Sequence, residues 1–132
     1  MSSSQDSLRQ SEERFRAIFE ATQDMVFVRD RDLKITHLNP AMAKVFARPA
    51  EKLIGLRSED LYGVEAGTHI REVDLRVLSG ESIEEQRTLP ITGGNLTWNI
   101  VKVPLRNAED EIVGLCGIAR DITDWQRQAR VR

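Results

Sequence analysis

One segment, residues 96–105, is apolar on both of its predicted faces, and it constrains the fold more than any other feature. Successive side chains of a β-strand point to opposite sides of the sheet. One face of this strand would carry Leu96, Trp98 and Ile100. The other face would carry Val101, Val103 and Leu105. Because an antiparallel sheet that is wetted on one side alternates apolar with polar residues, this strand predicts a sheet that is covered on both sides.

The segments around this strand predict an α+β domain. Asn39 and Pro40 indicate the start of a helix, because the Asn side chain can accept from a free amide of the first turn and Pro has no amide to leave unpaired. The other predicted helices span 58–62 and 65–79. The predicted strands span 25–29, 33–38, 82–91, 96–105 and 112–120. This segregation of helices and strands favours one antiparallel sheet with helices on one face.

The N-terminal region is predicted to be a polar tail followed by a helix. Residues 1–7 are rich in Ser, so they are expected to be disordered or foreign to the natural protein. A flanking helix is predicted over 8–23, where Leu8, Phe15 and Ile18 recur at helical spacing. This helix either lies on its own domain or pairs with a second copy, as the interval of seven from Leu8 to Phe15 suits. Two heptads are too few to decide between these alternatives.

Composition and charge exclude several classes of partner. The 132 residues suit one domain, and 19 Lys and Arg oppose 21 Asp and Glu for a net charge of −2. This balance argues against a nucleic-acid partner or an anionic membrane surface. No apolar run reaches the roughly 18 residues of a membrane-spanning helix, and the first ten residues lack the apolar core of a secretory signal. The single cysteine, Cys116, cannot form an internal disulfide, so a cytoplasmic location is expected.

Residue patterns for catalysis are missing from the sequence. Glu84 and Glu85 are adjacent, so on a strand they face opposite sides and cannot act as a pair. Cys116 lies in an apolar strand, where a thiol usually serves as a small hydrophobic side chain. Two histidines and one cysteine, far apart in sequence, do not suggest a structural metal site. We therefore expect no catalytic residues, no metal and no enzymatic activity in this chain.

Several short motifs together resemble PAS domains. They are ITHLNPA at 35–41, AEKLIG at 50–55, VKVPLR at 101–106, IVG at 112–114 and GIARDIT at 117–123. The Asp-Ile-Thr sequence at 121–123 is the most specific piece. Each motif alone is short, but their order and spacing match the family over about residues 12–126.

The resemblance implies a PAS-like five-stranded antiparallel sheet, in the order 2-1-5-4-3, with short helices over one face. The PAS core would span 24–122, preceded by the flanking helix and followed at 123–132 by the start of a C-terminal signalling helix. Signal coupling to an output domain would involve Asp121, Ile122 and Thr123. Two positions depart from the family pattern: Asp110 replaces a turn glycine, and Asp124-Trp125 replaces Glu-Arg.

The resemblance also implies a pocket between sheet and helices that holds a small ligand in some members. The side chains predicted to line it are Met25, Phe27, Ile35, Met42, Phe46, His69, Ile70, Val73, Val77, Leu89, Trp98 and Ile100. Haem-binding members use a histidine on the central helix, near the place of His69. Flavin photochemistry is not expected, because the only cysteine lies on the last strand. The resemblance implies no particular cofactor.

The expected function is that of a sensory or relay module within a larger cytoplasmic signalling protein, of the histidine kinase or diguanylate cyclase type. The module would form a homodimer and bind a small molecule in the core pocket, while catalysis would belong to a separate output domain. One alternative is a ligand-free interaction module whose pocket is filled by side chains such as Trp98. A haem sensor that uses His69 is a further alternative.

Overall fold

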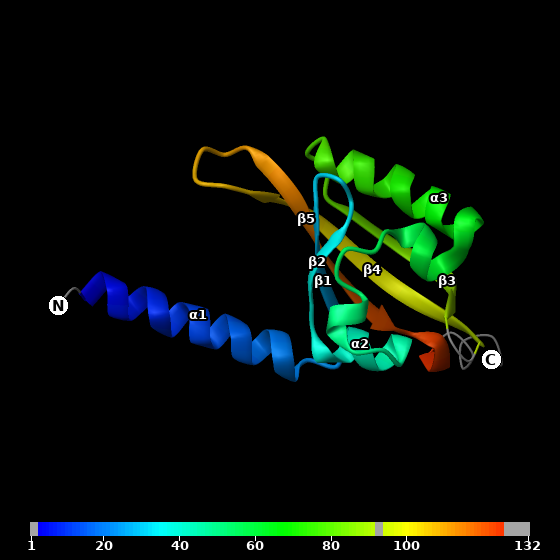
Figure 1. Cartoon of the computed structure of the whole chain (residues 1–132), viewed down its shortest axis with the longest axis horizontal. Coiled ribbons are helices and arrows are strands. Elements are labelled where there is room, and N and C mark those ends of the chain that lie inside the picture. Colours follow the sequence, from blue (N-terminus) through cyan, green and yellow to red (C-terminus); the bar gives the residue numbers. More distant parts are fainter. Residues whose placement is uncertain (1–2, 92–93, 126–132) are drawn as a thin grey trace.

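A five-stranded antiparallel sheet with helices on one face forms the body of the molecule (Figure 1). The computed structural model describes residues 3–91 and 94–125. The strands are β1 (Met25–Asp30), β2 (Ile35–Leu38), β3 (Ile83–Ile91), β4 (Gly94–Arg106) and β5 (Ile112–Asp121). The helices are α1 (Ser3–Ala21), α2 (Pro40–Phe46), the short 3₁₀ turn η1 (Ala50–Lys52) and α3 (Ser58–Leu78). The strand order β2-β1-β5-β4-β3 confirms the predicted topology.

Asn39 begins α2, as its position before Pro40 predicted. Its Oδ1 atom accepts from the backbone N–H of Met42 at 3.2 Å, which is the expected N-cap contact. The same oxygen accepts from the N–H of Val26 at 3.0 Å, and its Nδ2 group donates to the carbonyl of Asp24 at 2.9 Å. This buried amide therefore fixes the start of α2 against the start of β1.

The long helix α3 contains a kink at Gly63. There φ is +87° and ψ is 171°, a conformation that favours glycine, and it separates the two helical stretches predicted at 58–62 and 65–79. The helix ends at Leu78, and Gly80 follows with φ at +115°. Side chains of Ile70 and Val77 reach the core from this helix. In Figure 1 α3 lies across the concave side of the sheet.

The inner face of the sheet carries the core, and the long strand β4 contributes to both faces as predicted. Trp98 and Ile100 of β4 are buried on the inner face, and Lys102 continues the same row. Val103, on the other face, keeps 38% of its surface exposed. The outer face is therefore apolar but incompletely covered.

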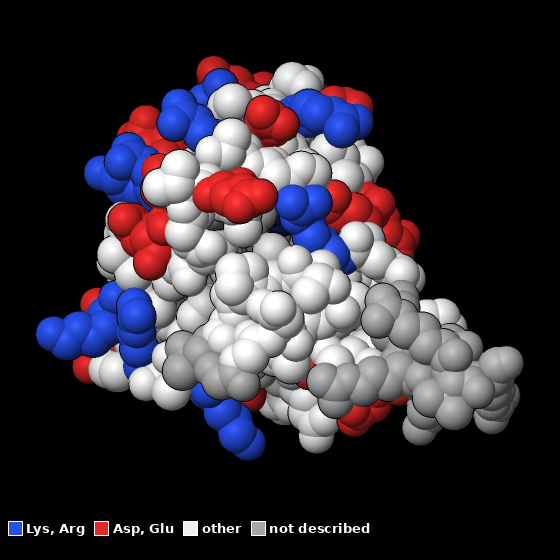
Figure 2. All heavy atoms as spheres, turned by 90° about the vertical axis from the view of Figure 1, so that its right-hand side faces the viewer, with Lys and Arg blue, Asp and Glu red and all other residues white. Residues whose placement is uncertain are grey.

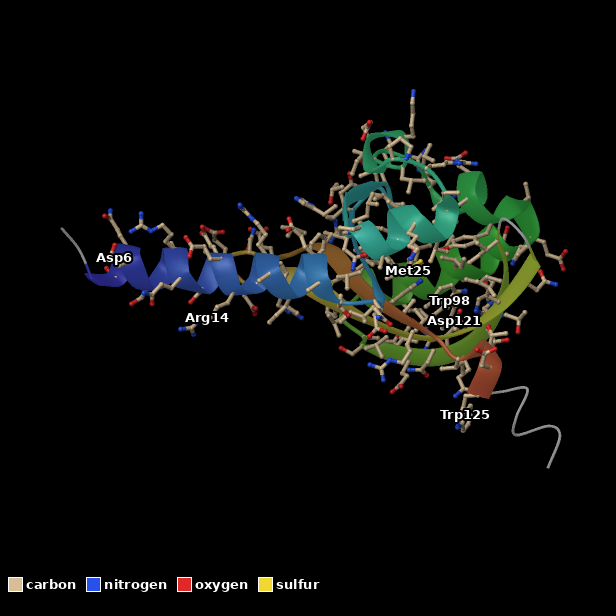
Figure 3. All side chains as sticks on the ribbon, turned by 90° about the horizontal axis from the view of Figure 1, so that it is seen from below. Asp6, Arg14, Met25, Trp98, Asp121 and Trp125 are labelled. Carbon is tan, nitrogen blue, oxygen red and sulfur yellow. The ribbon has the colours of Figure 1, made fainter. Side chains whose placement is uncertain are left out.

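Helix α1 begins at Ser3 and not near residue 8, so the predicted tail of residues 1–7 is wrong in its extent. Polar residues suit the first turn of a helix, and Asp6 there lies at the positive end of the helix dipole. Asp6 also accepts from Arg9 at 3.0 Å. Figures 1 and 3 show that α1 extends away from the sheet, with Asp6 and Arg14 far from the body that holds Met25 and Trp98.

The surface carries charges of both signs. Lys and Arg are interspersed with Asp and Glu on the face drawn in Figure 2, as expected for a net charge of −2. None of the helices in the described part of the chain combines the length and the apolar character needed to cross a membrane.

Candidate functional site

A cavity of about 20 Å³ lies between the sheet and α3. This volume accommodates roughly one water molecule. Its walls are Met25, Phe27, Arg29, Tyr62, Ile70, Leu89, Ile100, Lys102 and Ala119. Five predicted pocket residues are among them: Met25, Phe27, Ile70, Leu89 and Ile100. The cavity thus lies beside these five residues, and side chains fill most of the space between sheet and helix.

The other predicted pocket residues are placed elsewhere. Six are buried without lining this cavity: Ile35, Met42, Phe46, Val73, Val77 and Trp98. His69 faces β3, where its Nε2 atom lies 3.1 Å from a carboxylate oxygen of Glu85. The side chain of His69 is one-third exposed, so it connects α3 to β3 near the surface and does not line the cavity.

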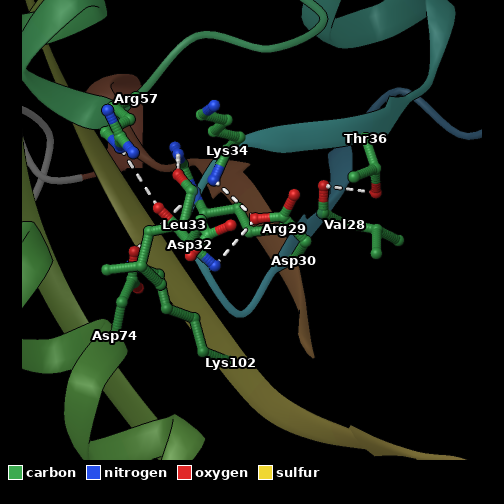
Figure 4. A network of polar contacts seen from close by, with 10 residues as sticks. All are labelled: Val28, Arg29, Asp30, Asp32, Leu33, Lys34, Thr36, Arg57, Asp74 and Lys102. Atoms are coloured by element: carbon green, nitrogen blue, oxygen red, sulfur yellow. Dashed lines mark hydrogen bonds and ion pairs between the residues drawn. The ribbon is translucent and has the colours of Figure 1, made fainter. Parts of the chain in front are cut away.

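Three ionisable side chains, Arg29, Asp74 and Lys102, meet beside the cavity, and Arg29 and Lys102 form part of its wall. Figure 4 shows the three residues. Asp74 of α3 is completely buried, and its Oδ1 atom accepts from Nζ of Lys102 at 2.6 Å. Its Oδ2 atom lies 3.7 Å from Nε of Arg29 on β1. Arg29 and Lys102 retain 1% and 3% of their surface. We refer to Arg29, Asp74 and Lys102 as the buried ionic cluster.

Arg29 is held in place by contacts from its own hairpin. Its Nη1 group donates to the carbonyl of Leu33 at 3.0 Å, and Leu33 adopts a left-handed backbone with φ at +65°. The guanidinium carbon lies 5.3 Å from the centre of the Phe27 ring, a cation–π distance. Nε of Arg29 and Oδ2 of Asp74 nevertheless have no hydrogen-bond partner in the described part of the chain.

Burial controls the protonation of the groups around the cluster. Loss of hydration lowers the pKa of Lys102, although Asp74 opposes this effect. Glu85 also favours the charged lysine, while Arg29 disfavours it. Burial raises the pKa of Tyr62 to about 12. Arg29 lowers this pKa and Asp74 raises it, each by less than burial does. The wall of the cavity therefore combines three ionisable side chains, Arg29, Tyr62 and Lys102, with apolar residues.

The buried ionic cluster was not identified from the sequence, although the strand period could have indicated its two cations. Arg29 follows Met25 and Phe27 at intervals of two, and Lys102 follows Trp98 and Ile100 in the same way. Each strand therefore places a charge on its apolar face. Such a pattern indicates a buried charge that needs a partner.

At the end of β5, the three predicted coupling residues form a compact turn. Thr123 Oγ1 accepts from the N–H of Thr97 at 2.9 Å, and the N–H of Ile122 donates to the Thr97 carbonyl at 2.8 Å. Asp121 Oδ1 accepts from the N–H of Thr123 at 2.9 Å. These bonds attach the exit of the domain to β4. Residues 123–125 begin a helical turn, and the rest of the predicted helix over 123–132 lies outside the described residues.

A second connection, missed by the sequence analysis, joins the entrance and the exit of the domain. The guanidinium of Arg120, near the end of β5, donates to both carboxylate oxygens of Asp24 at 3.3 and 3.2 Å. Asp24 lies between α1 and β1, and its carbonyl accepts from Asn39. We refer to Asp24 and Arg120 as the linker pair. It joins residues that are 96 positions apart in the sequence.

An apolar groove of about 670 Å³ lies between α1 and the outer face of the sheet. Its walls are Ser11, Glu12, Phe15, Arg16, Phe19, Glu20, Val26, Val28, His37, Leu105 and Cys116. On the helix Phe15 is 65% exposed and Ile18 is 69% exposed. Burial raises the pKa of the Cys116 thiol. The groove and the neighbouring surface of α1 form a continuous apolar area that residues 3–91 and 94–125 do not cover.

The sequence and the fold are similar to those of known proteins. A family model described as the PAS fold matches residues 19–127. The methanogenesis regulatory histidine kinase FilI of Methanothrix harundinacea is 42% identical over 118 residues, which are 89% of this chain and 13% of that protein. A diguanylate cyclase of Vibrio cholerae is 29% identical over 103 residues, 75% of this chain and 32% of that protein. The crystal structure of a PAS domain from Colwellia psychrerythraea has a TM-score of 0.74 at 20% identity, covering 85% of this chain and 97% of that one.

Proposed function

Because this chain belongs to the PAS family, we propose that it is a sensory and signal-relay module of a larger cytoplasmic signalling protein, which dimerises through α1. The output domain would be a histidine kinase or a diguanylate cyclase, and catalysis would take place there. The observation that carries the dimer is the exposed apolar face of α1 beside the apolar groove.

A second copy of this chain is the partner that suits this surface. The exposed face of α1 carries Leu8, Phe15 and Ile18, and the outer face of the sheet adds Val103 and Ile118. In a two-fold dimer the helix of each protomer can cover the sheet of the other, because both surfaces belong to the same chain. Burying each of the three helix side chains would stabilise the dimer by roughly 1.5–3 kcal/mol. This arrangement would supply the second cover that the apolar strand β4 requires.

The linker pair gives such a dimer a means of relay. Asp24 follows α1, and Arg120 precedes the exit at Asp121, so a rotation of α1 would change the contact that holds the exit. A signal can act only through different affinities for two arrangements of these segments. Input at α1 or in the core would therefore bias the direction in which the chain leaves the domain.

The small cavity favours a specific version of this function. A space of about 20 Å³ holds no drug-sized molecule, so the module would work with a core that is mostly filled by its own side chains. This supports a relay whose pocket takes nothing larger than about one water molecule over a haem sensor, because His69 is engaged by Glu85 and does not line the cavity.

The dimer can be tested with two matched variants of α1. Phe15→Asp places a charge on the apolar face, and Ala17→Asp places the same charge on the opposite, exposed face. Sedimentation equilibrium should give a dimer for the unchanged chain and for Ala17→Asp, and a monomer for Phe15→Asp. The single cysteine provides a second reading, because Cys116 lines the groove and should react faster with a thiol reagent in the Phe15→Asp monomer. A monomer at every concentration of the unchanged chain would refute the dimer.

A further inference from the structure

The buried ionic cluster carries more positive than negative charge. Among the described residues, the buried Lys, Arg, Asp and Glu side chains are Arg29, Lys102 and Asp74. The core therefore holds two basic side chains and one carboxylate. Glu85, the next carboxylate to influence Lys102, lies near the surface and is already paired with His69. An unbalanced buried charge costs several kcal/mol in lost hydration. The cluster therefore requires a compensating group or the loss of a proton.

The cavity lies beside these cations. Arg29, Lys102 and Tyr62 form part of its wall. Nε of Arg29 has no hydrogen-bond acceptor among the described residues, because the carboxylate oxygen that faces it, Oδ2 of Asp74, lies 3.7 Å away and is also without a hydrogen-bond partner. An N–H group that is 99% buried and lacks an acceptor is rare in proteins, and it indicates a place for one more group. The volume of about 20 Å³ restricts that group to the size of roughly one water molecule.

We propose that this cavity binds one compact monovalent anion, either a halide ion or the carboxylate of a very short acid. A monovalent anion would bring the cluster to two positive and two negative charges, and it would give the Arg29 N–H an acceptor. The inference rests on the proposed function in that it names the input that the module would sense. A doubly charged anion would exceed the positive charge available, and a bulky one would exceed the volume.

The apolar part of the wall determines which acids fit. Met25, Ile70 and Leu89 close the apolar side of this small space, so an alkyl group on the acid would fit only if they moved. Formate should therefore bind more tightly than acetate, and affinity should fall further as the alkyl chain lengthens. The core would discriminate among short acids by size, and the two buried cations would discriminate by charge.

Thermal unfolding in matched salts tests the proposal on the intact chain. Sodium chloride, bromide, formate and acetate are compared with sodium gluconate at the same ionic strength, because the carboxylate of gluconate is attached to a chain too bulky for the cavity. Binding to the folded chain alone should raise Tm by about 5 °C for each tenfold increase in anion concentration above the dissociation constant. A stronger response to halide or to formate identifies the preferred source of the anion.

Two variants with equal changes in charge supply the control. Lys102→Met removes the excess buried charge and should abolish the difference between chloride and gluconate. Lys44→Met removes an exposed lysine of α2 and should preserve it. In case Lys102→Met does not fold, bromide located in crystals of the unchanged chain by anomalous scattering gives an independent answer, and a bromide in the cavity supports the proposal.

Three outcomes would overturn the inference. Equal Tm values in all salts would mean that a water molecule or a neutral Lys102 resolves the imbalance. An anion response that persists in Lys102→Met, or bromide found at the surface only, would mean an adventitious ion only. The anion test and the dimer test can fail independently. A monomer whose Tm responds to anions contradicts only the proposed function, and a dimer whose Tm does not respond contradicts only this inference.

Discussion

Replacing Asp74 with Asn would leave Arg29 and Lys102 buried without their carboxylate. At an effective dielectric constant of about 20, the attraction over 2.6 Å to Lys102 amounts to about 6 kcal/mol, and that over 3.7 Å to Arg29 to about 4 kcal/mol. Lost hydration offsets much of this attraction, so the expected cost of breaking the cluster is about 3–5 kcal/mol of unfolding free energy. For a domain of this size, such a loss lowers Tm by about 10–20 °C.

Urea unfolding followed by circular dichroism measures this cost. Asp32→Asn makes the same chemical change at an exposed position and should leave stability nearly unchanged. In the double variant Asp74→Asn/Lys102→Met one buried cation is removed as well, so the loss should be smaller than the sum of the two single losses. A loss below about 1 kcal/mol for Asp74→Asn, or additive losses in the double variant, would refute the reasoning that the three charges depend on one another.

Three further predictions follow from single contacts. Tyr62 is the only tyrosine, so tyrosinate absorbance reports its ionisation alone. Because burial raises its pKa from 10.0 to about 12, the neutral side chain stabilises the folded chain by about 3 kcal/mol below pH 10, and this stabilisation is lost as pH rises through 12. Tyr62→Phe should abolish that loss in urea unfolding. Gly117→Ala should lower the free energy of unfolding by about 1–3 kcal/mol, because the added methyl would overlap the Phe27 ring; an unchanged urea midpoint would contradict this overlap. Arg120→Gln should leave the urea midpoint nearly unchanged, since its ion pair is exposed, yet alter regulation of the output domain in a longer chain, whereas unaltered regulation would remove the linker pair from the relay.

The sequence was informative where a simple period governs the structure. The alternation of Trp98 and Ile100 with residues of the opposite face located the long strand and its two apolar sides. Asn39 before Pro40 located the start of α2, because capping depends on neighbours within one turn. Asp110, noted as a replacement for glycine, indeed adopts a left-handed backbone with φ at +63°. Asp tolerates this conformation better than most residues, so the turn is preserved.

The parts that were missed depend on contacts between distant segments. Lys102 and Asp74 are 28 positions apart, and Arg120 and Asp24 are 96 apart, so no local pattern connects either pair. The size of the cavity is equally a tertiary property. Trp98 was a reasonable candidate to fill it, but the filling comes from many side chains packed at the density of a protein interior.

Stability alone does not account for the buried ionic cluster. Well-packed apolar side chains at its three positions could stabilise the core equally well or better, since buried charges lose much of their hydration. The charges couple the positions of three elements, because Asp74 on α3 forms ion pairs with Arg29 on β1 and with Lys102 on β4. β5 lies between those two strands, and the linker pair joins the end of β5 to the segment that precedes β1. A change in the charge of the core would therefore act on the same strands that hold the entrance and the exit of the domain, which is the arrangement that a relay requires.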